Sequence, residues 1–214
     1  MAKVKRIGKG CAVKCLPDKY VVVDIETTGL DPQSNEIIEI SALKYEQNVL
    51  IDSYHTLVHP NESISTFITG LTGITNEMVK NAPDISECIH DFYSFVKNEV
   101  IVGYNINFDL NFLYDNLKVC TNEILSNNYL DVLLLTRRVY PSLSSHKQTA
   151  VAEYLGINIQ GAHRAEKDCM ICQAILEDIQ KKVKEKIAVK QSFLDLILYP
   201  FSFFKTYSKK NETR

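Results

Sequence analysis

Apolar residues in the N-terminal third of the chain fall into short runs separated by polar connections. The first run covers about residues 20–25 and contains three consecutive valines, Val21 to Val23. Because β-branched side chains suit a pleated surface, this run predicts a buried strand. Two further runs, at about 36–45 and 49–58, follow after short connections of the kind that join antiparallel neighbours. The pattern therefore predicts an antiparallel meander of three strands.

Beyond residue 60, helical patterns alternate with short apolar runs. The run at 100–103 is reached from the preceding strand through helix, so it is expected to add to the sheet in parallel, and a fifth strand is expected at 128–132. The glycine-containing segment 69–75 is expected to form a tight apolar loop. Helices are expected over about 76–79, 84–97, 108–117, 133–139, 146–155 and 164–183.

The first strand ends in two acids, Asp24 and Glu26, two residues apart. On a strand, this spacing points both carboxylates to one face. Two like charges at the end of a buried strand repel each other and resist desolvation, so a divalent cation between them is the simplest expectation. The alternative is a strand end with two solvated acids. Further acidic residues later in the chain decide between these two interpretations.

Two more acids occupy the apolar faces of predicted helices. Asp109 falls between Phe112 and Leu113 on a helical wheel, and Asp168 projects into the apolar stripe of the last helix. A buried carboxylate without a partner becomes protonated or destabilises the fold. Strand ends and helix starts of an α/β sheet converge on one edge, so we expect the four acids to meet there. Four carboxylates can hold two Mg²⁺ or Mn²⁺ ions, and zinc is less favoured because this set holds no cysteine and only one histidine, His163.

Length and composition indicate the size of the domain and the compartment in which the protein works. The chain has 214 residues and 45% apolar content, enough for one domain with extensions. No run approaches the length of a membrane span and the N-terminus lacks the apolar stretch of a signal peptide, so we expect a cytoplasmic protein whose six cysteines stay reduced. Cys11 and Cys15 have no second ligand pair at a suitable spacing, which argues against a zinc site.

The net charge of −2 conceals an acidic body between basic ends. Residues 1–19 hold six Lys and Arg against one acid, and residues 181–214 hold nine against three. Phosphate contacts are therefore expected from metals, backbone donors or those ends; the alternative is that both ends are solvated, poorly ordered termini. The aromatic residues of 193–207 are expected to pack on the domain, with a partner protein, stacked bases or a membrane surface as alternatives.

Three segments together resemble the exonuclease motifs of the DEDDh 3′-5′ exonuclease family. They are Asp24-Ile25-Glu26-Thr27-Thr28-Gly29, Asn105-Ile106-Asn107-Phe108-Asp109 and His163-Arg164-Ala165-Glu166-Lys167-Asp168. The resemblance covers about residues 18–180 and is strongest to proofreading exonucleases such as the epsilon subunit of bacterial DNA polymerase III. It implies an α/β, ribonuclease H-like fold, with three antiparallel strands continued by two parallel ones and helices on both faces. We therefore take residues 19–183 as the exonuclease domain, between a basic extension at 1–18 and a basic, aromatic one at 184–214.

The resemblance also implies a role for each motif residue. Asp24 would bridge two metal ions, and three acids would complete the cage: Glu26, Asp109 and Asp168. His163 would be the general base, and Arg164, where the related DEDDy branch has tyrosine, favours the histidine branch. The terminal nucleotide would contact the following residues: Thr27, Thr28, Gly29, Leu71, Thr72, Ile74, Asn105 and Phe108. At the position of Thr72 many relatives have histidine, whereas others share threonine.

The expected function is a metal-dependent 3′-5′ exonuclease that releases nucleoside 5′-monophosphates from the 3′ ends of single-stranded or frayed DNA. A polymerase or another protein is expected as a partner of the C-terminal tail. RNA trimming by the same chemistry is the first alternative, because metal and phosphate contacts do not read the sugar. The second is a non-catalytic module that binds nucleic acid or a polymerase through the basic, aromatic ends.

Overall fold

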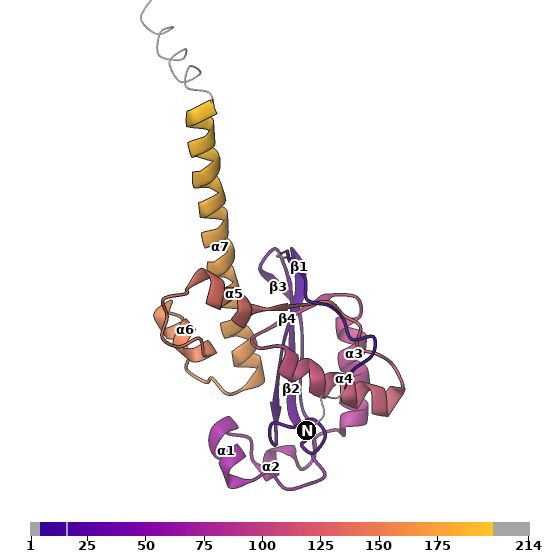
Figure 1. Cartoon of the computed structure of the whole chain (residues 1–214). Helices are drawn as coiled ribbons and strands as arrows, with labels where there is room; N and C mark the ends of the chain where they lie inside the picture. Colours follow the sequence, from indigo (N-terminus) through magenta and orange to yellow (C-terminus); the bar gives the residue numbers. More distant parts are fainter. Residues whose placement is uncertain (1–4, 16, 199–214) are drawn as a thin grey trace, which may run out of the picture. The chain divides into compact units, whose positions relative to one another are not determined.

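The computed structural model describes residues 5–15 and 17–198, with side chains described as far as residue 187 (Figure 1). The chain divides into two compact units, residues 1–177 and residues 178–214. In the second unit, the described part is the C-terminal portion of one helix. Within the described ranges, no helix has the length and apolar character needed to cross a bilayer. All six cysteines are unpaired, as expected for reduced thiols.

A five-stranded mixed sheet forms the centre of the first unit, with the order β3-β2-β1-β4-β5 (Figure 1). The strands are β1 (Lys19–Thr27), β2 (Ile37–Glu46), β3 (Val49–Leu57), β4 (Val100–Gly103) and β5 (Tyr129–Asp131). The first three pair antiparallel, and β4 and β5 continue the sheet in parallel, which confirms the predicted topology. Gln47 and Asn48 have φ values of 50° and 65°, the geometry of a two-residue hairpin turn between β2 and β3.

The helices follow the predicted order, with two corrections. They are α1 (Thr66–Thr72), α2 (Asn76–Val79), α3 (Ile85–Val96), α4 (Asn107–Thr121), α5 (Val132–Val139), α6 (Gln148–Tyr154) and α7 (Ala165–Leu198). The expected loop at 69–75 was wrong in its first part, because Ser65 caps α1 at its start and Gly73, at φ 73°, ends it. The last helix runs past its expected end at 183, since residues 184–198 include three lysines and three leucines, which favour helix, and lack glycine and proline.

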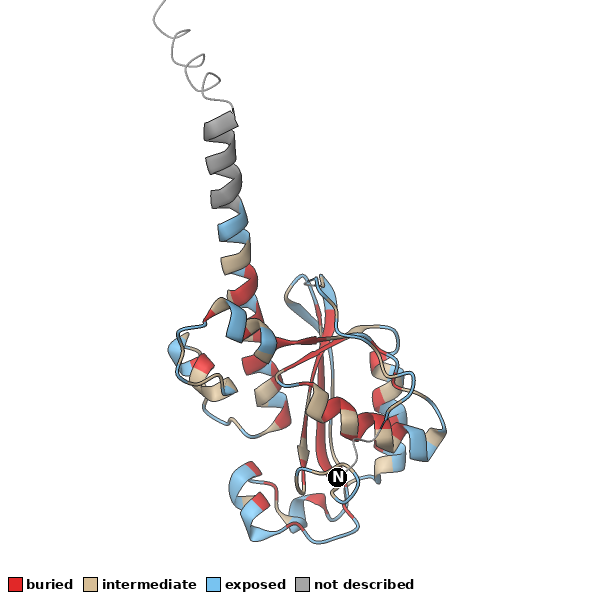
Figure 2. Cartoon of the chain, in the orientation of Figure 1, coloured by how far each residue is buried: buried red, intermediate tan, exposed pale blue. Residues whose placement is uncertain are grey.

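Alternate residues of β1 face opposite sides of the sheet. Val21, Val23 and Ile25 belong to the large core that α3 and α4 complete on one side, and Figure 2 shows that both helices carry buried as well as exposed residues. Tyr20 lies on the other side, where its hydroxyl donates a 2.7 Å hydrogen bond to Gln173 of α7. The two acids of β1 share the parity of Tyr20, so both carboxylates face α7 rather than the large core.

The N-terminal segment 5–15 packs along α4 and β5. A parallel bridge joins Ala12 to Tyr129, so the segment covers the outer edge of β5, where unpaired backbone groups would otherwise invite association. Arg6 donates two hydrogen bonds to Asp115 of α4, at 2.8 and 2.5 Å. Residues 5–15 are therefore attached to the domain through backbone and side-chain hydrogen bonds, which argues against a poorly ordered terminus there, although most of these residues are exposed to solvent. The aromatic stretch 193–207 lies outside the residues whose side chains are described.

Candidate active site

The end of β1 brings three of the predicted acids together. Asp24 and Glu26 lie at its C-terminal end, and Asp168 lies in the first turn of α7. One carboxylate oxygen from each of the three can be chosen so that all lie within 4.8 Å of one another. Oxygen ligands at this spacing suit a hard divalent cation such as Mg²⁺ or Mn²⁺.

The fourth predicted acid reaches the same strand end from the opposite side of the sheet. Asp109 lies in the first turn of α4 and is 4% exposed. Its Oδ1 accepts a 3.2 Å hydrogen bond from the backbone N–H of Ile25, the residue between Asp24 and Glu26. Asp109 is therefore fixed to the strand end, although it is not one of the three acids whose oxygens cluster.

Burial, and then repulsion between neighbouring carboxylates, raises the pKa values of these acids. Burial, followed by the nearby charges of Asp168 and Glu39, raises the pKa of Glu26 to about 8. Burial also raises the pKa of Asp109 to about 8. For Asp24, burial and the charge of Asp109 raise the pKa well above its ordinary value. The pocket therefore lacks enough positive charge of its own to keep its carboxylates ionised, and a bound cation would supply it.

His163 lies in the exposed loop that precedes α7. Its backbone has a φ of 66°, a left-handed conformation that is uncommon for a residue with a side chain. Its backbone N–H donates a 3.0 Å hydrogen bond to Oδ2 of Asp168, which links the loop directly to one acid of the cluster. The structure thus brings the predicted base beside the predicted metal ligands.

Glu39 is a residue at this site that the sequence motifs do not include. It lies on β2 directly opposite Glu26 in the β1–β2 register and is 0% exposed. Its carboxylate accepts hydrogen bonds from the Arg164 side chain, with Nε at 3.0 and 3.2 Å and Nη2 at 2.5 Å, and from the backbone N–H of Ala165 at 2.9 Å. A signal was present in the sequence, because an acid flanked by Ile38 and Ile40 in a buried strand requires a partner.

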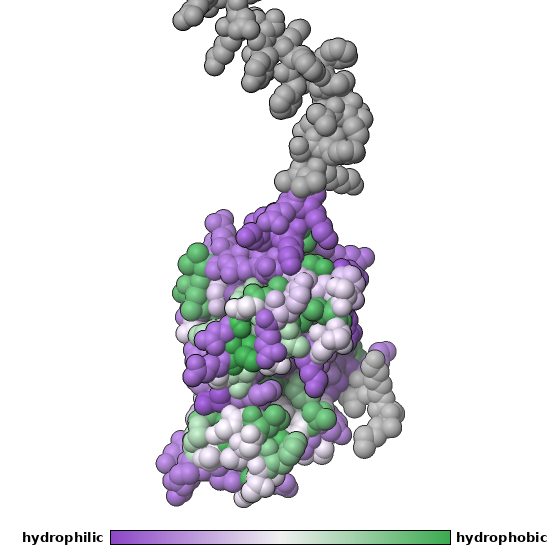
Figure 3. Space-filling model, turned by 90° about the vertical axis from the view of Figure 1, so that its left-hand side faces the viewer, coloured by the Kyte–Doolittle hydropathy of each residue, from purple (hydrophilic) through white to green (hydrophobic). Residues whose placement is uncertain are grey.

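The predicted nucleotide contacts on α1 and the turn after it divide into exposed and buried residues. Leu71 is 47% exposed, whereas Thr72 and Ile74 are 3% and 0% exposed. The Thr72 hydroxyl donates to the backbone of Ile68, and Ile74 belongs to a small core beneath α1. Figure 3 shows hydrophobic side chains among hydrophilic ones at the lower end of the face where α1 lies. Of the three residues, only Leu71 is therefore open to a substrate in this structure.

The other predicted contacts lie in the turns that follow β1 and β4. Thr27 is buried, and its hydroxyl donates a 2.6 Å hydrogen bond to the carbonyl of Gly29. Asn105 is exposed at a φ of 58°, and its backbone N–H donates to Oδ1 of Asp131 at 3.1 Å. Phe108 is partly buried, with its ring 5.1 Å from that of Phe112. Asn105 and Phe108, which follow β4, thus lie at the same end of the sheet as the acids that end β1.

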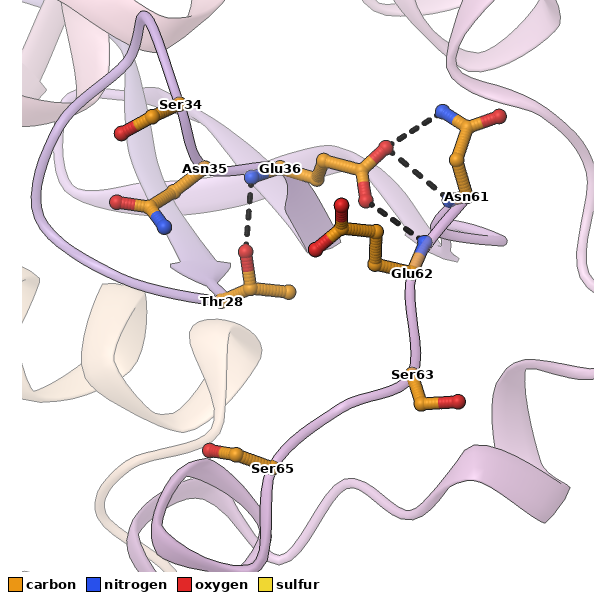
Figure 4. Close-up of a pocket in the computed structure, with 8 residues that line it drawn as sticks. All are labelled: Thr28, Ser34, Asn35, Glu36, Asn61, Glu62, Ser63 and Ser65. Atoms are coloured by element: carbon orange, nitrogen blue, oxygen red, sulfur yellow. Dashed lines mark hydrogen bonds between the residues drawn. The ribbon is translucent and has the colours of Figure 1, made fainter.

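A polar cavity of about 320 Å³ opens beside Thr28 (Figure 4). Its walls come from the loop between β1 and β2 and the loop between β3 and α1. The Glu36 N–H donates to the Thr28 hydroxyl at 2.9 Å, and the Glu36 carboxylate accepts from the Asn61 N–H at 3.0 Å and from its amide Nδ2 at 2.6 Å. These bonds tie the turn that follows β1 to the loop that leads into α1. The lining residues are Thr28, Ser34, Asn35, Glu36, Asn61, Glu62, Ser63 and Ser65.

A mixed sheet of this order, with carboxylates converging at the end of its central strand, defines a nuclease of the ribonuclease H-like fold. The sequence matches the RNase_T family of exonucleases over residues 21–176, which is most of the chain. The chain therefore belongs to this exonuclease family.

Named relatives and solved structures agree with this assignment. The chain is 33% identical to DNA polymerase III subunit epsilon of Treponema pallidum over 158 residues, covering 73% of this chain and 74% of the relative. It is 40% identical to the PolC-type DNA polymerase III of Clostridium perfringens over 172 residues, which is 80% of this chain but only 12% of that protein. Exonuclease X, solved in complex with 5′ overhanging duplex DNA, superimposes with a TM-score of 0.63 at 26% identity, covering 76% of this chain and 92% of that one. E. coli Exonuclease I shares the fold, with a TM-score of 0.69 at 18% identity over 84% of this chain and 44% of that one.

Proposed function

We propose that this exonuclease removes nucleoside 5′-monophosphates from the 3′ ends of DNA, in a reaction that depends on divalent metal ions. The observation that carries the proposal is the convergence of Asp24, Glu26 and Asp168, whose oxygens come within 4.8 Å of one another. A solvated pair of surface acids would not account for a third carboxylate that arrives from a helix more than a hundred residues away. The earlier alternative of two solvated acids is therefore disfavoured.

The residues of the pocket fit the metal ions that the proposal requires. The ligands are hard carboxylate oxygens, and burial without a compensating charge raises their pKa values. Asp24, Glu26, Asp109 and Asp168 would be the residues that hold the Mg²⁺ or Mn²⁺ ions. Such ions supply an activated water and stabilise the charge on the departing 3′ oxygen.

The remaining roles belong to side chains around the cluster. His163 would take the proton of the attacking water, since an exposed imidazole in a loop beside Asp168 can both reach a water and pass the proton to solvent. Leu71 and Phe108 would pack against the base and sugar of the terminal nucleotide. The turn from Thr27 to Gly29 would hold its 3′ end. Together these contacts orient the last phosphodiester across the acids.

DNA is proposed as the substrate because relatives are named as DNA polymerase III proteins and Exonuclease X was solved with DNA. Single-stranded or frayed 3′ ends are the proposed form of this substrate. We also propose that the enzyme acts beside a DNA polymerase in the cytoplasm. The tail that would contact such a partner lies largely outside the described residues.

The test compares the wild-type protein with Asp24→Asn on oligonucleotides labelled at the 5′ end, with Mg²⁺ or Mn²⁺. We expect the wild type to shorten DNA stepwise from the 3′ end, and Asp24→Asn to lose this activity while it keeps cooperative thermal unfolding. Asp52→Asn, a change at an exposed acid of β3, is the matched control and should behave as wild type. Failure of the wild type to shorten DNA or RNA with either metal would overturn the proposal in favour of a binding module. Faster shortening of RNA than of DNA would overturn the substrate assignment alone.

A further inference from the structure

The ion pair between the buried Glu39 and the partly exposed Arg164 joins the strands of the site to its loop and helix. Glu39 lies on β2, directly across from Glu26 of β1. Arg164 lies between His163 and Ala165, the first residue of α7. One carboxylate therefore connects the strand that carries two acids to the loop and helix start that carry the base and the third acid.

The contacts of Glu39 satisfy its carboxylate within the protein. The planar guanidinium of Arg164 meets it through Nε and Nη2 at 2.5 to 3.2 Å, and the Ala165 N–H donates at 2.9 Å. His55 on β3 adds its Nε2 at 3.6 Å from the same carboxylate. A forked guanidinium–carboxylate pair fixes orientation as well as distance, which a single contact cannot do. Glu39 is thus committed to holding this loop and is not offered to a cation.

The loop needs such a restraint. His163 has a left-handed backbone at φ 66° and an exposed side chain. A conformation of this kind persists only where the surroundings hold it. Two contacts hold the backbone next to His163: the His163 N–H bond to Asp168 and the Arg164 bond to Glu39 lie on either side of the peptide bond that links His163 to Arg164.

We propose that Glu39 is a positioning residue for the exonuclease reaction, which holds His163 in place through Arg164. The inference rests on the proposed function. It predicts that loss of the pair lowers kcat with little change in the KM for DNA, because the binding residues of the turn at 27–29 and of α1 do not depend on it. A purely structural role would instead lower stability and act independently of His163.

A double-mutant cycle separates the two roles. We expect Glu39→Gln to lower kcat by about 10²-fold, the loss that a misplacement of about 1 Å can bring. In a His163→Ala background, the same change should lower kcat by less than about threefold, because the group that it positions is already absent. Asp115→Asn, which breaks the forked pair between Arg6 and α4, is the matched control. Its effect on kcat should be the same in both backgrounds.

Two further measurements keep the inference testable. Mn²⁺ binding to Glu39→Gln, followed by calorimetry, should match the wild type, because the proposed metal ligands are untouched. If Glu39→Gln does not fold, Arg164→Lys takes its place in the cycle, since lysine keeps the charge but cannot make the fork. Equal effects of the change with and without His163, or an unaltered kcat, would overturn the inference. If the wild type itself is inactive, it is the proposed function that fails.

Discussion

Replacement of Glu26 by glutamine should abolish activity yet stabilise the metal-free protein at alkaline pH. The metal-free folded state keeps a proton on Glu26 up to a pKa of about 8, whereas the unfolded chain releases it near the ordinary value of 4.5. Between these values the folded state binds more protons than the unfolded state, so stability falls as the pH rises. The loss of stability caused by ionising the buried Glu26 is therefore absent below a pH of about 4.5 and reaches its full size above a pH of about 8. Glutamine removes this penalty because it cannot ionise.

The size of the stabilisation expected for Glu26→Gln follows from the difference between the folded and unfolded pKa values of Glu26. One pH unit corresponds to about 1.4 kcal/mol, so a rise from 4.5 to about 8 sets an upper limit of roughly 5 kcal/mol. Glu26 is mostly buried but not sealed from solvent, and local relaxation reduces the penalty. We therefore expect Glu26→Gln to gain roughly 2 to 5 kcal/mol over wild type at pH 8.5 and close to nothing at pH 4.5.

Urea unfolding of both proteins in EDTA, from pH 4.5 to 8.5, measures this difference directly. Glu62→Gln removes an exposed acid and serves as the control, with no gain expected at either pH. Addition of Mn²⁺ at pH 8.5 should then stabilise the wild type, by about 2.7 kcal/mol at a hundredfold excess over Kd, and should stabilise Glu26→Gln less. A free energy of unfolding for Glu26→Gln that follows wild type at every pH would refute the electrostatic reasoning.

Two further predictions concern the N-terminal segment and α1. A Cβ on Gly10 would lie 1.9 Å from the carbonyl oxygen of Asn127, so Gly10→Ala should displace the N-terminal segment. We expect the free energy of unfolding to fall by about 1–3 kcal/mol and trypsin cleavage after Lys14 to become faster. An unchanged rate of proteolysis would contradict this packing. Leu71 is 47% exposed, so Leu71→Ser should raise the KM for DNA without lowering the melting temperature. The control Val119→Ser, at a position 84% exposed on α4, should leave KM unchanged. Equal KM values for the wild type and both variants would show that Leu71 is not part of the binding surface.

Much of the fold was predictable because its signals are local. The valines at the start of the first strand, the short connections of the meander and the period of the helices each depend on neighbouring residues alone. The motif acids were also identifiable, since a carboxylate in an apolar run requires a partner wherever it occurs. The structure then brings one oxygen each of Asp24, Glu26 and Asp168 within 4.8 Å of one another, whereas the fourth expected acid, Asp109, meets β1 through the backbone N–H of Ile25.

Features that depend on distant partners were decided by the tertiary structure alone. Glu39 and Arg164 are 125 positions apart, and nothing near either residue indicates which opposite charge it meets. The basic N-terminal segment reads as a solvated tail until the edge of β5 and the Asp115 side chain are seen beside it. Similarly, Ile74 is apolar and lies close to Leu71 in the chain, yet only Leu71 faces solvent. Periodicity shows that a side chain needs an apolar surface or an opposite charge, but only the packing of distant elements decides which surface or charge it finds.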